Sequence, residues 1–546
     1  MKASIKSGLI LLCALIFLSM LTEVRTQAAD YKFNMSYIFF GKSYTGLVDK
    51  TQNSLNEVAP NYFSLNKNGS LALTSAISAS FISDMHKRGI SVVPYLTNDW
   101  SRSVGRAAMK NRQALAQALA DAVITYGLDG VNIDIENLTS SDRDDFVEFV
   151  QLLRAALPEG KSIAVSVAAN PWGISTGWQG SYDYARLAEY SDYLMIMAYD
   201  EHYCGGPAGP VSSLSFVEKS IKYAVSVIPK EKVVLGLPFY GRIWSNTGGY
   251  PNGTGITNAK IAQLVNSYGG CVSVDPASRS TKAVFTISQD AKKPVVGGQA
   301  LAAGTYTIWY EGEQSIKEKL SLVTKYDIKG TGSWALGEES DSTWDYYKLW
   351  LNSCTFGDIE KSWAKDNILE AYLDGWADGI SDTRFSPDAP LTRAQAVTMI
   401  VKRLGIELVS DPALQFDDCV GSWAEPYIET ARQYHIADGI GNNLFDPDRT
   451  VTREELAVML KNATSYQVKT DVSDGNNAFT DVSQTSNPES YNAIETLRQN
   501  GILFGYTDGS FRPEKIATRA EATVMISRLT PGTAETAVFT GDGGLF

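Results

Sequence analysis

The sequence predicts an α/β fold: a (β/α)8 TIM barrel with a small α+β insertion, followed by three mostly α-helical repeats. Two observations carry this prediction. From residue 30 to about residue 350, short apolar runs alternate with amphipathic stretches of helical period. Beyond Cys354, a set of short motifs recurs three times, with a period of about 60 residues. A chain of 546 residues is long enough for several domains.

Residues 1–29 have the pattern of a secretory signal peptide. Lys2 and Lys6 precede an apolar run from Gly8 to Leu21, and small residues such as Ala28 follow it. The run is about 14 residues long, whereas a helix needs roughly 20 to cross a bilayer. We therefore expect a secreted protein with no membrane span after cleavage.

Composition limits the chemistry that this chain can perform. The formal net charge of −13 argues against nucleic acid and anionic membranes as partners. With only three histidines in the chain, acid–base chemistry must rest mainly on carboxylates, and we predict no metal and no other cofactor. The four cysteines after the signal show no CxxC spacing, which argues against a zinc site. A bridge between Cys204 and Cys271 and free thiols are equally compatible with the sequence.

Eight apolar runs are the candidate barrel strands. Several are rich in Val and Ile with little polar alternation, as expected for buried parallel strands, and helical patterns such as 107–126 and 141–157 lie between them. The expected barrel domain covers 30–353, with an insertion at about 245–308, where the chain is rich in Gly, Ser and Thr. The candidate strands are 34–40, 62–65, 91–96, 130–135, 162–168, 193–199, 232–239 and 332–336.

Three polar residues alternate along the fourth candidate strand. Asn132, Asp134 and Glu136 share one strand face and should point into the barrel, while Val131 and Ile133 point outward. Glu136 falls at the carboxyl end of the strand, where the active sites of TIM barrels lie. Repulsion between the two carboxyl groups should raise the pKa of one of them and keep a proton available at neutral pH.

The segment Asp129-Gly-Val-Asn-Ile-Asp-Ile-Glu136 resembles the Asp-Gly-x-Asp-x-Asp-x-Glu motif of glycoside hydrolase family 18. Three further elements match this family in order: Met197-Ala-Tyr-Asp200 on the sixth strand, Gly236–Arg242 on the seventh, and Trp334 on the eighth. The resemblance spans about residues 30–350, and several ordered motifs make it specific.

The resemblance implies a role for each matching residue. Glu136 would be the general acid and base, and Asp134, Tyr199 and Asp200 would hold the acetamido group of the substrate. In this family the substrate's own acetamido carbonyl attacks C1, so that configuration is retained without an enzyme nucleophile. The implied substrate-binding residues are Asn132, Met197, Trp334, Tyr240 and Arg242.

Asn132 departs from the family pattern, which usually has Asp there. Its amide can still hydrogen-bond Asp134, so we expect an altered pH profile rather than loss of activity. Together with 197–203 and 209–211, Asn132 is most similar to the branch that contains spore-cortex-lytic peptidoglycan N-acetylglucosaminidases. Peptidoglycan, chitin and N-glycan remain open as substrates, as do exo and endo action. A non-catalytic glycan-binding lectin and an S-layer structural protein are the alternative functions.

The three C-terminal repeats share a Phe-x-Asp motif, a Phe-x-Pro motif and a Thr-Arg pair. Each threonine is a predicted helix N-cap, because Gln or Glu follows three residues later, as in a capping box. The predicted repeats are 354–410, 411–470 and 475–535.

These repeats resemble S-layer homology domains, which bind secondary cell-wall polysaccharide in Gram-positive-type envelopes. The resemblance implies that Arg393, Arg453 and Arg519 donate charge-assisted hydrogen bonds to an anionic sugar. Trp363 and Trp423 are sugar contacts or core residues. The whole sequence thus predicts a secreted glycosidase at the cell wall or S-layer of a Gram-positive-type bacterium. Its expected partners are a β-linked glycan that contains N-acetylglucosamine (GlcNAc), as substrate, and the wall polysaccharide.

Overall fold

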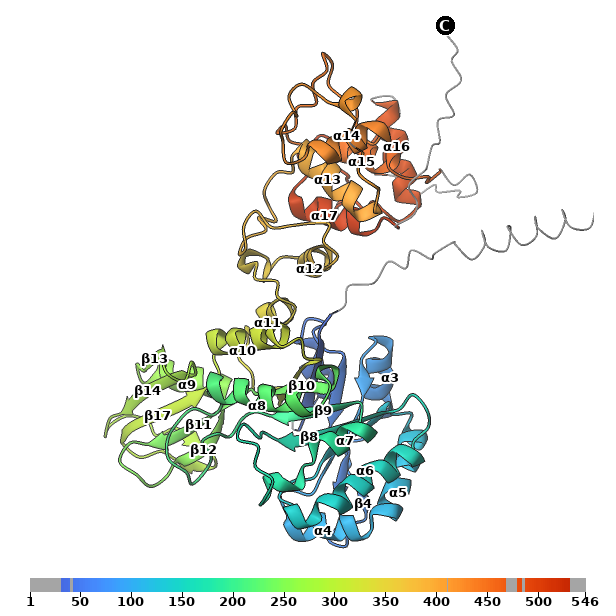
Figure 1. The fold of residues 1–546 in the computed structure, drawn as a ribbon. Helices are drawn as coiled ribbons and strands as arrows, with labels where there is room; N and C mark the ends of the chain where they lie inside the picture. Colours follow the sequence, from blue (N-terminus) through green and yellow to red (C-terminus); the bar gives the residue numbers. More distant parts are fainter. Residues whose placement is uncertain (1–30, 40–42, 410, 468–478, 484–486, 531–546) are drawn as a thin grey trace, which may run out of the picture. The chain divides into compact units, whose positions relative to one another are not determined.

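The computed structural model describes residues 31–39, 43–409, 411–467, 479–483 and 487–530. The predicted signal peptide therefore lies outside the described residues. The chain divides into two compact units, one of Tyr31–Cys354 and one that follows from Thr355 (Figure 1). Within the described ranges, no helix is long and apolar enough to cross a membrane.

Parallel strands form a closed barrel in the first unit. Each strand pairs with the next, and the last, β18, pairs with both β10 and β1. The third barrel strand consists of two pieces, β5 and β6, which continue one another across Val93 and Pro94, so that eight strands complete the ring. The strands are β1 (Phe33–Ile38), β2 (Glu57–Pro60), β5 (Ser91–Val92), β6 (Tyr95–Thr97), β7 (Gly130–Asp134), β8 (Ser162–Ala168), β9 (Tyr193–Met197), β10 (Val233–Pro238) and β18 (Gly330–Trp334).

The second barrel strand begins earlier than predicted. The strand that pairs with β1 is β2, whereas the predicted run at 62–65 forms β3 (Phe63–Leu65), which pairs with β6 and with β4 (Leu71–Leu73). The pattern missed β2 because Glu57 is a buried polar residue, 4% exposed. Its carboxyl group accepts a hydrogen bond from the Tyr193 hydroxyl at 2.5 Å.

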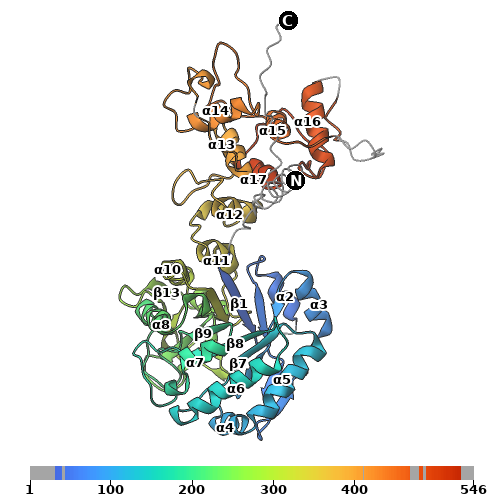
Figure 2. The ribbon, with the colours of Figure 1, turned by 45° about the vertical axis from the view of Figure 1, so that its right-hand side comes forward.

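Helices surround the barrel, and α5, α6 and α7 lie outside β7, β8 and β9 (Figure 2). Val131, Ile133 and Ile135 are fully buried in the core between strands and helices, which confirms the predicted alternation along β7. The predicted helix at 107–126 is two helices that meet at Asn111. The helices are α2 (Tyr44–Asp49), α3 (Ala79–Lys87), α4 (Arg102–Lys110), α5 (Arg112–Tyr126), α6 (Arg143–Ala156), α7 (Tyr184–Tyr190), α8 (Leu214–Val227), α10 (Glu313–Lys325) and α11 (Thr343–Leu351).

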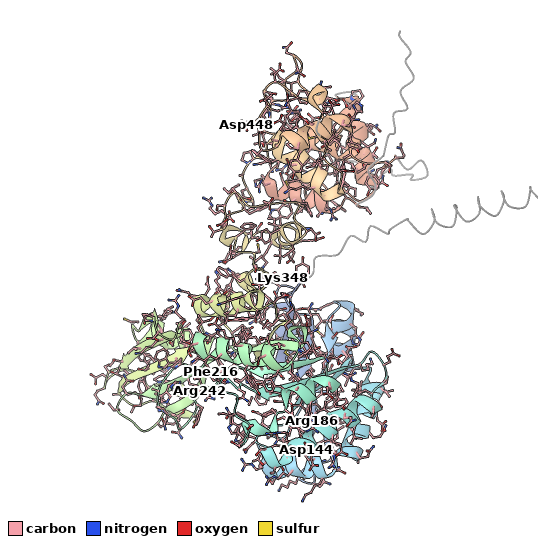
Figure 3. All side chains as sticks on the ribbon, viewed as in Figure 1. Asp144, Arg186, Phe216, Arg242, Lys348 and Asp448 are labelled. Carbon is pink, nitrogen blue, oxygen red and sulfur yellow. The ribbon has the colours of Figure 1, made fainter. Side chains whose placement is uncertain are left out.

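Ion pairs stabilise this unit both at its surface and in its interior. Arg186 of α7 pairs with Asp144 of α6 at 2.5 Å, on an exposed face (Figure 3). In contrast, Lys319 of α10 pairs with Glu311 where both side chains are almost completely buried. The hydroxyl of Ser280 also donates to Glu311, at 3.0 Å. This buried pair ties the inserted domain to the barrel helices.

The insertion after β10 is a small α+β domain, as predicted, but it begins at Tyr240 rather than near residue 245. Its five strands are antiparallel, in the order β12-β11-β17-β14-β13. Tyr240 and Arg242 therefore lie on the inserted sheet and not on the seventh barrel strand. The elements are β11 (Tyr240–Ser245), β12 (Asn252–Thr257), α9 (Asn258–Ser267), β13 (Cys271–Val274), β14 (Thr281–Ile287), β15 (Val295–Val296), β16 (Gln299–Ala300) and β17 (Gly304–Tyr310).

The second unit is mostly helical. The predicted capping boxes are confirmed: Thr392, Thr452 and Thr518 each cap a helix reciprocally with the residue three positions later. The Phe-x-Asp motif also has a structural role, because Asp358 accepts hydrogen bonds from the backbone of Phe385 and Ser386, at 2.9 and 2.7 Å. The same pairing recurs in the other two repeats. The helices are α12 (Lys365–Leu373), α13 (Arg393–Leu404), α14 (Glu425–Gln433), α15 (Arg453–Asn462), α16 (Pro488–Gln499) and α17 (Arg519–Ser527).

Candidate active site

A buried asparagine fixes the backbone of Glu136. Asn98, which follows β6, accepts a hydrogen bond from the Glu136 amide at 2.8 Å and donates one to the Glu136 carbonyl, also at 2.8 Å. Asn98 is 2% exposed, so these bonds are shielded from water. The next residue, Asn137, has a φ of 60°, and Arg102 donates to its carbonyl and its side chain, both at 2.7 Å. The loops after the third and fourth strands thus hold Glu136 in place.

Burial raises the pKa values of both carboxyl groups on this strand. The pKa of Glu136 lies well above its usual range because of burial first and the charges of Asp134 and Asp200 next. Burial also raises the pKa of Asp134, with a smaller contribution from Asp99. Burial therefore favours the protonated form of Glu136. The repulsion that the sequence suggested is present, but desolvation is the larger cause.

Asn132 lies below the two carboxyl groups and is fully buried. Its Oδ1 accepts hydrogen bonds from Ser166 Oγ at 3.0 Å and from the Tyr37 hydroxyl at 3.3 Å. Its Nδ2 has no partner among the residues that the structure describes. The expected hydrogen bond between Asn132 and Asp134 is therefore not formed. Asn132 is instead part of a polar cluster with Ser166 and Tyr37, whose oxygens lie 2.6 Å apart.

Asp200 joins the barrel to the insertion. Arg242 donates to its two oxygens from Nε and Nη2, at 2.8 and 2.7 Å. The Tyr240 hydroxyl donates to the first of these oxygens, at 2.7 Å. Bidentate pairs of this kind are among the strongest charge-assisted hydrogen bonds, so this carboxylate is held in one orientation.

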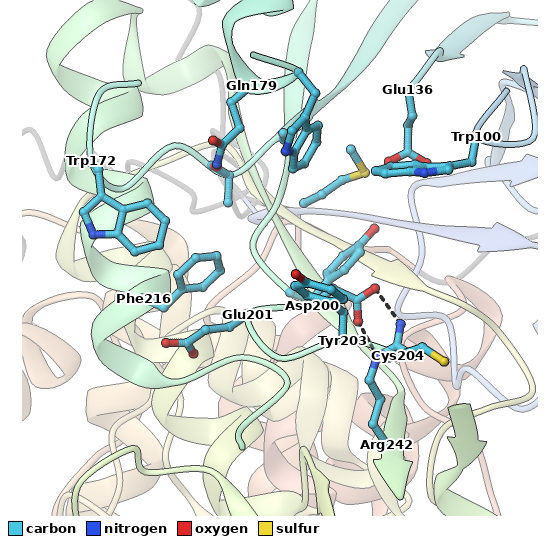
Figure 4. A pocket seen from close by; sticks show the side chains of 15 residues that line it. Trp100, Glu136, Trp172, Gln179, Asp200, Glu201, Tyr203, Cys204, Phe216 and Arg242 are labelled. Carbon is cyan, nitrogen blue, oxygen red and sulfur yellow. Dashed lines mark hydrogen bonds and ion pairs between the residues drawn. The ribbon is translucent and has the colours of Figure 1, made fainter. Parts of the chain in front are cut away.

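Glu136 lines two adjoining chambers of one cleft, and Figure 4 shows the side chains of the outer one. The outer chamber has a volume of about 730 Å³ and the inner chamber about 350 Å³. Both are lined by Glu136, Met197, Tyr199, Asp200 and Arg242, together with Trp100. Aromatic side chains dominate the outer chamber: Trp172, Trp178, Tyr203 and Phe216. Polar and aromatic groups line the inner one: Tyr37, Asp134, Tyr240, Trp334 and Glu338.

Eight of the nine residues predicted for the active site line this cleft, and only Asn132 lies beneath it. Trp334 is partly exposed to the inner chamber and packs against Tyr37, with ring centroids 5.2 Å apart. Trp334 therefore contributes to the wall of the inner chamber. Asn98, Glu338 and the tryptophans of the outer chamber were not among the predicted site residues. Trp100 and Trp172 follow barrel strands directly, and this position alone could have identified them.

The four cysteines of the two described units are all free thiols. Cys204 is exposed and lines the outer chamber, while Cys271 is exposed on β13. Among the described residues, no group of three His, Cys, Asp or Glu side chains is arranged to hold a metal ion.

In the repeats, the predicted arginines contact the neighbouring repeat. Arg393, Arg453 and Arg519 are at most 6% exposed. The Nε of each donates to the carbonyl of a Phe-x-Pro phenylalanine, at 2.9, 2.8 and 2.9 Å: Phe445, Phe511 and Phe385 respectively. Much of their hydrogen-bonding capacity thus serves the fold.

One repeat cavity brings two of the predicted wall-binding residues together. Trp423 and Arg519 line a cavity of about 440 Å³, together with Trp376 and Lys402. Trp363 and Trp423 are 67% and 64% exposed, so neither is a core residue. This cavity combines aromatic surface with cationic groups, as a site for an anionic sugar requires.

Comparison with known proteins agrees with this architecture. The model of glycosyl hydrolases family 18 matches residues 95–339, and that of the S-layer homology domain matches 355–397, 415–457 and 478–523. The uncharacterized glycosylase YvbX of Bacillus subtilis (strain 168) is 27% identical over 317 residues, which are 55% of this chain and 86% of that protein. The cortical fragment-lytic enzyme of the same organism is 24% identical over 292 residues, 52% of this chain and 64% of that protein.

A solved structure shares the barrel. The crystal structure of a chitinase from Chromobacterium violaceum ATCC 12472 is similar with a TM-score of 0.53 and 26% identity, over 59% of this chain and 99% of that one. The chain thus carries a glycoside hydrolase family 18 domain, followed by three S-layer homology repeats.

Proposed function

We propose that this chain is a secreted glycosidase that cleaves β-linked glycans containing GlcNAc by a substrate-assisted, retaining mechanism. One observation carries the proposal: Glu136, with a pKa raised by burial, lies at the centre of the cleft on a backbone fixed by Asn98. A carboxyl group that keeps its proton at neutral pH can act as a general acid.

The reaction uses the substrate as its own nucleophile. Glu136 protonates the glycosidic oxygen while the substrate's acetamido carbonyl attacks C1 and expels the leaving sugar. Asp134 lines only the inner chamber, so the sugar that carries the reacting acetamido group occupies that chamber, with Tyr199 beside it. Glu136 then accepts a proton from water as water attacks C1, and two inversions restore the configuration. Asp200 accepts hydrogen bonds from Arg242 and Tyr240, which fix its position in the chamber wall. Its charge also favours the protonated form of Glu136.

Peptidoglycan and chito-oligosaccharide are the two substrates that the relatives support. One relative is named a cortical fragment-lytic enzyme and another a chitinase. The S-layer homology repeats would hold the enzyme next to wall glycan, which favours peptidoglycan.

The test is turnover of a 4-methylumbelliferyl chito-oligosaccharide and of purified peptidoglycan by wild type and Glu136→Gln. We expect a rate loss of about 10² to 10⁴, the usual contribution of general acid–base catalysis. Glu159→Gln, at an exposed residue beyond α6, is the control. Equal rates for wild type and Glu136→Gln would reject catalysis by Glu136 and leave a glycan-binding lectin.

We further propose that the repeats bind secondary cell-wall polysaccharide through the cavity lined by Trp423, Arg519 and Lys402. The full chain should sediment with purified walls, and should no longer do so once the wall polysaccharide is removed. Trp423→Ala should weaken binding. Val420→Ala, at an apolar residue of the same repeat that is also 64% exposed, should not. Undiminished sedimentation with stripped walls would reject this role.

A further inference from the structure

Glu338 has a position in the inner chamber that neither the fold nor the proposed reaction explains. It follows β18 by four residues and lines the chamber together with Trp334 and Tyr240. Its amide donates to the Ala335 carbonyl at 3.2 Å, and its carbonyl accepts from the Asn258 amide of the insertion at 2.8 Å. Barrel and insertion therefore both fix the backbone that carries this carboxyl group.

One oxygen of the Glu338 carboxyl group lacks a donor. Its Oε2 is buried and has no hydrogen-bond partner among the residues that the structure describes. The neighbouring Glu339 shows the contrast, because its two oxygens accept from the Gly337 amide at 2.6 Å and from Trp344 Nε1 at 3.1 Å. A buried acceptor without a donor is unfavourable, so it needs a compensating gain elsewhere.

The ionisable side chains around Glu338 are mostly acidic. Four carboxyl groups line the inner chamber, those of Asp134, Glu136, Asp200 and Glu338. Arg242 is the one basic side chain among the described residues that line it, and its Nε and Nη2 donate to Asp200. Consistent with the missing donor, burial raises the pKa of Glu338 to about 7. A neutral sugar with hydroxyl donors suits this chamber, and an acidic sugar does not.

We propose that Glu338 determines specificity in the inner chamber: its Oε2 accepts a hydrogen bond from a hydroxyl group of a neutral sugar, and its carboxyl group disfavours a sugar with an acidic substituent. The inference rests on the proposed function, because the inner chamber holds the sugar whose anomeric carbon reacts. In glycan strands without their peptides, GlcNAc is neutral and N-acetylmuramic acid carries a carboxylate on its lactyl group. Glu338 thus directs cleavage to the bond on the reducing side of GlcNAc.

Two fluorogenic disaccharides test this selection. They are the 4-methylumbelliferyl β-glycosides of chitobiose and of GlcNAc-β-1,4-N-acetylmuramic acid. Release of the fluorophore requires the sugar attached to it to occupy the inner chamber. Wild type should prefer the chitobioside. Glu338→Ala should lower the ratio of the two kcat/KM values at least tenfold, by losing the hydroxyl contact and relieving the repulsion.

Glu338→Gln separates shape from charge. It keeps an acceptor oxygen, so it should retain most of the activity on chitobioside while gaining activity on the muramyl substrate. Glu159→Gln should leave the ratio unchanged. If Glu338→Ala leaves the ratio of the two kcat/KM values unchanged, because both substrates lose activity equally or not at all, the selection is overturned. The proposed glycosidase would remain intact. If wild type releases fluorophore from neither disaccharide, and does not cleave peptidoglycan, the proposed function fails together with this inference.

Discussion

Arg519 of the third repeat donates a hydrogen bond from Nε to the carbonyl of Phe385 in the first repeat, at 2.9 Å. Its Nη2 donates to the carbonyl of Asp378 at 2.7 Å. Because Arg393 contacts the second repeat and Arg453 the third in the same way, these bonds connect the three repeats in a cycle. The arginines therefore stabilise the arrangement of the repeats, whatever they contribute to wall binding.

Arg519→Ala should open this cycle. Hydrogen bonds from charged groups contribute about 1.5–3 kcal/mol each, so the loss of two should destabilise the repeats by about 3 kcal/mol or more. In limited proteolysis of the full chain, the region that follows residue 355 should then be cleaved about 100 times faster. This rate applies when the repeats open and close rapidly compared with cleavage. Arg384→Ala, at an arginine whose side chain is 66% exposed, is the control. Equal cleavage rates in the two variants would contradict a stabilising role for Arg519.

Asn98→Ala should reduce catalysis without removing any group that touches substrate. It deletes both hydrogen bonds that hold the Glu136 backbone. A displacement of about 1 Å can cost about 100-fold in rate, so kcat should fall 10- to 100-fold while KM changes little. The melting temperature, measured in parallel, separates misplacement from unfolding. A folded variant with wild-type kcat would show that the two bonds do not position the acid.

Asn132→Asp tests why this position differs from the family pattern. A carboxylate there could accept the hydrogen bonds of Ser166 and Tyr37 and would remove the unpartnered Nδ2. A further negative charge favours the protonated form of nearby carboxyl groups, so the already raised pKa of Glu136 should rise again. The alkaline limb of the pH profile of kcat/KM should therefore move up, by about one unit. A downward shift would contradict this electrostatic account.

Glu57 should make the barrel less stable as pH rises. Burial raises its pKa from 4.5 to about 8. The folded state then binds a proton that the unfolded state releases, so the contribution of Glu57 is fully present below pH 4.5 and declines until about pH 8. In the wild type, the free energy of unfolding should therefore fall by up to about 1.4 kcal/mol per pH unit across this range because of Glu57. Glu57→Gln should remove this contribution. If the free energy of unfolding varies with pH in the same way in the variant and the wild type, this role of Glu57 is contradicted.

The sequence predicted those parts of the fold in which local pattern and tertiary environment agree. Along β7 the alternation of apolar and polar residues matches the two faces of the barrel wall, so the orientation of Asp134 and Glu136 could be derived. The same pattern did not predict β2, because Glu57 is a polar residue that is buried there. It also placed the insertion too late, because β10 and β11 are separated by a single residue, Phe239, and read as one apolar run.

The functional residues that escaped prediction depend on contacts between distant segments. Asn98 acquires its role from Glu136, 38 residues away. The backbone of Glu338 is fixed partly by Asn258, in a domain whose shape the sequence did not reveal. Strand periodicity cannot report either contact. The arginines of the repeats show the converse: a motif identified them, but their partners became visible only in the structure.

Trp172→Ala should weaken binding of long glycans in particular. The Trp172 side chain is 64% exposed, lines the outer chamber and lies 6.0 Å from the ring of Phe216, so its surface is open to a sugar ring. If the leaving part of the glycan extends into the outer chamber, loss of this surface should cost about 1 kcal/mol, which raises KM several-fold. The effect should appear with chitohexaose and be absent with a chitobioside whose leaving group is only the fluorophore. Tyr126→Ala, at an exposed aromatic residue of α5, is the control. Equal changes of KM for the short and the long substrate would show that the glycan does not reach Trp172.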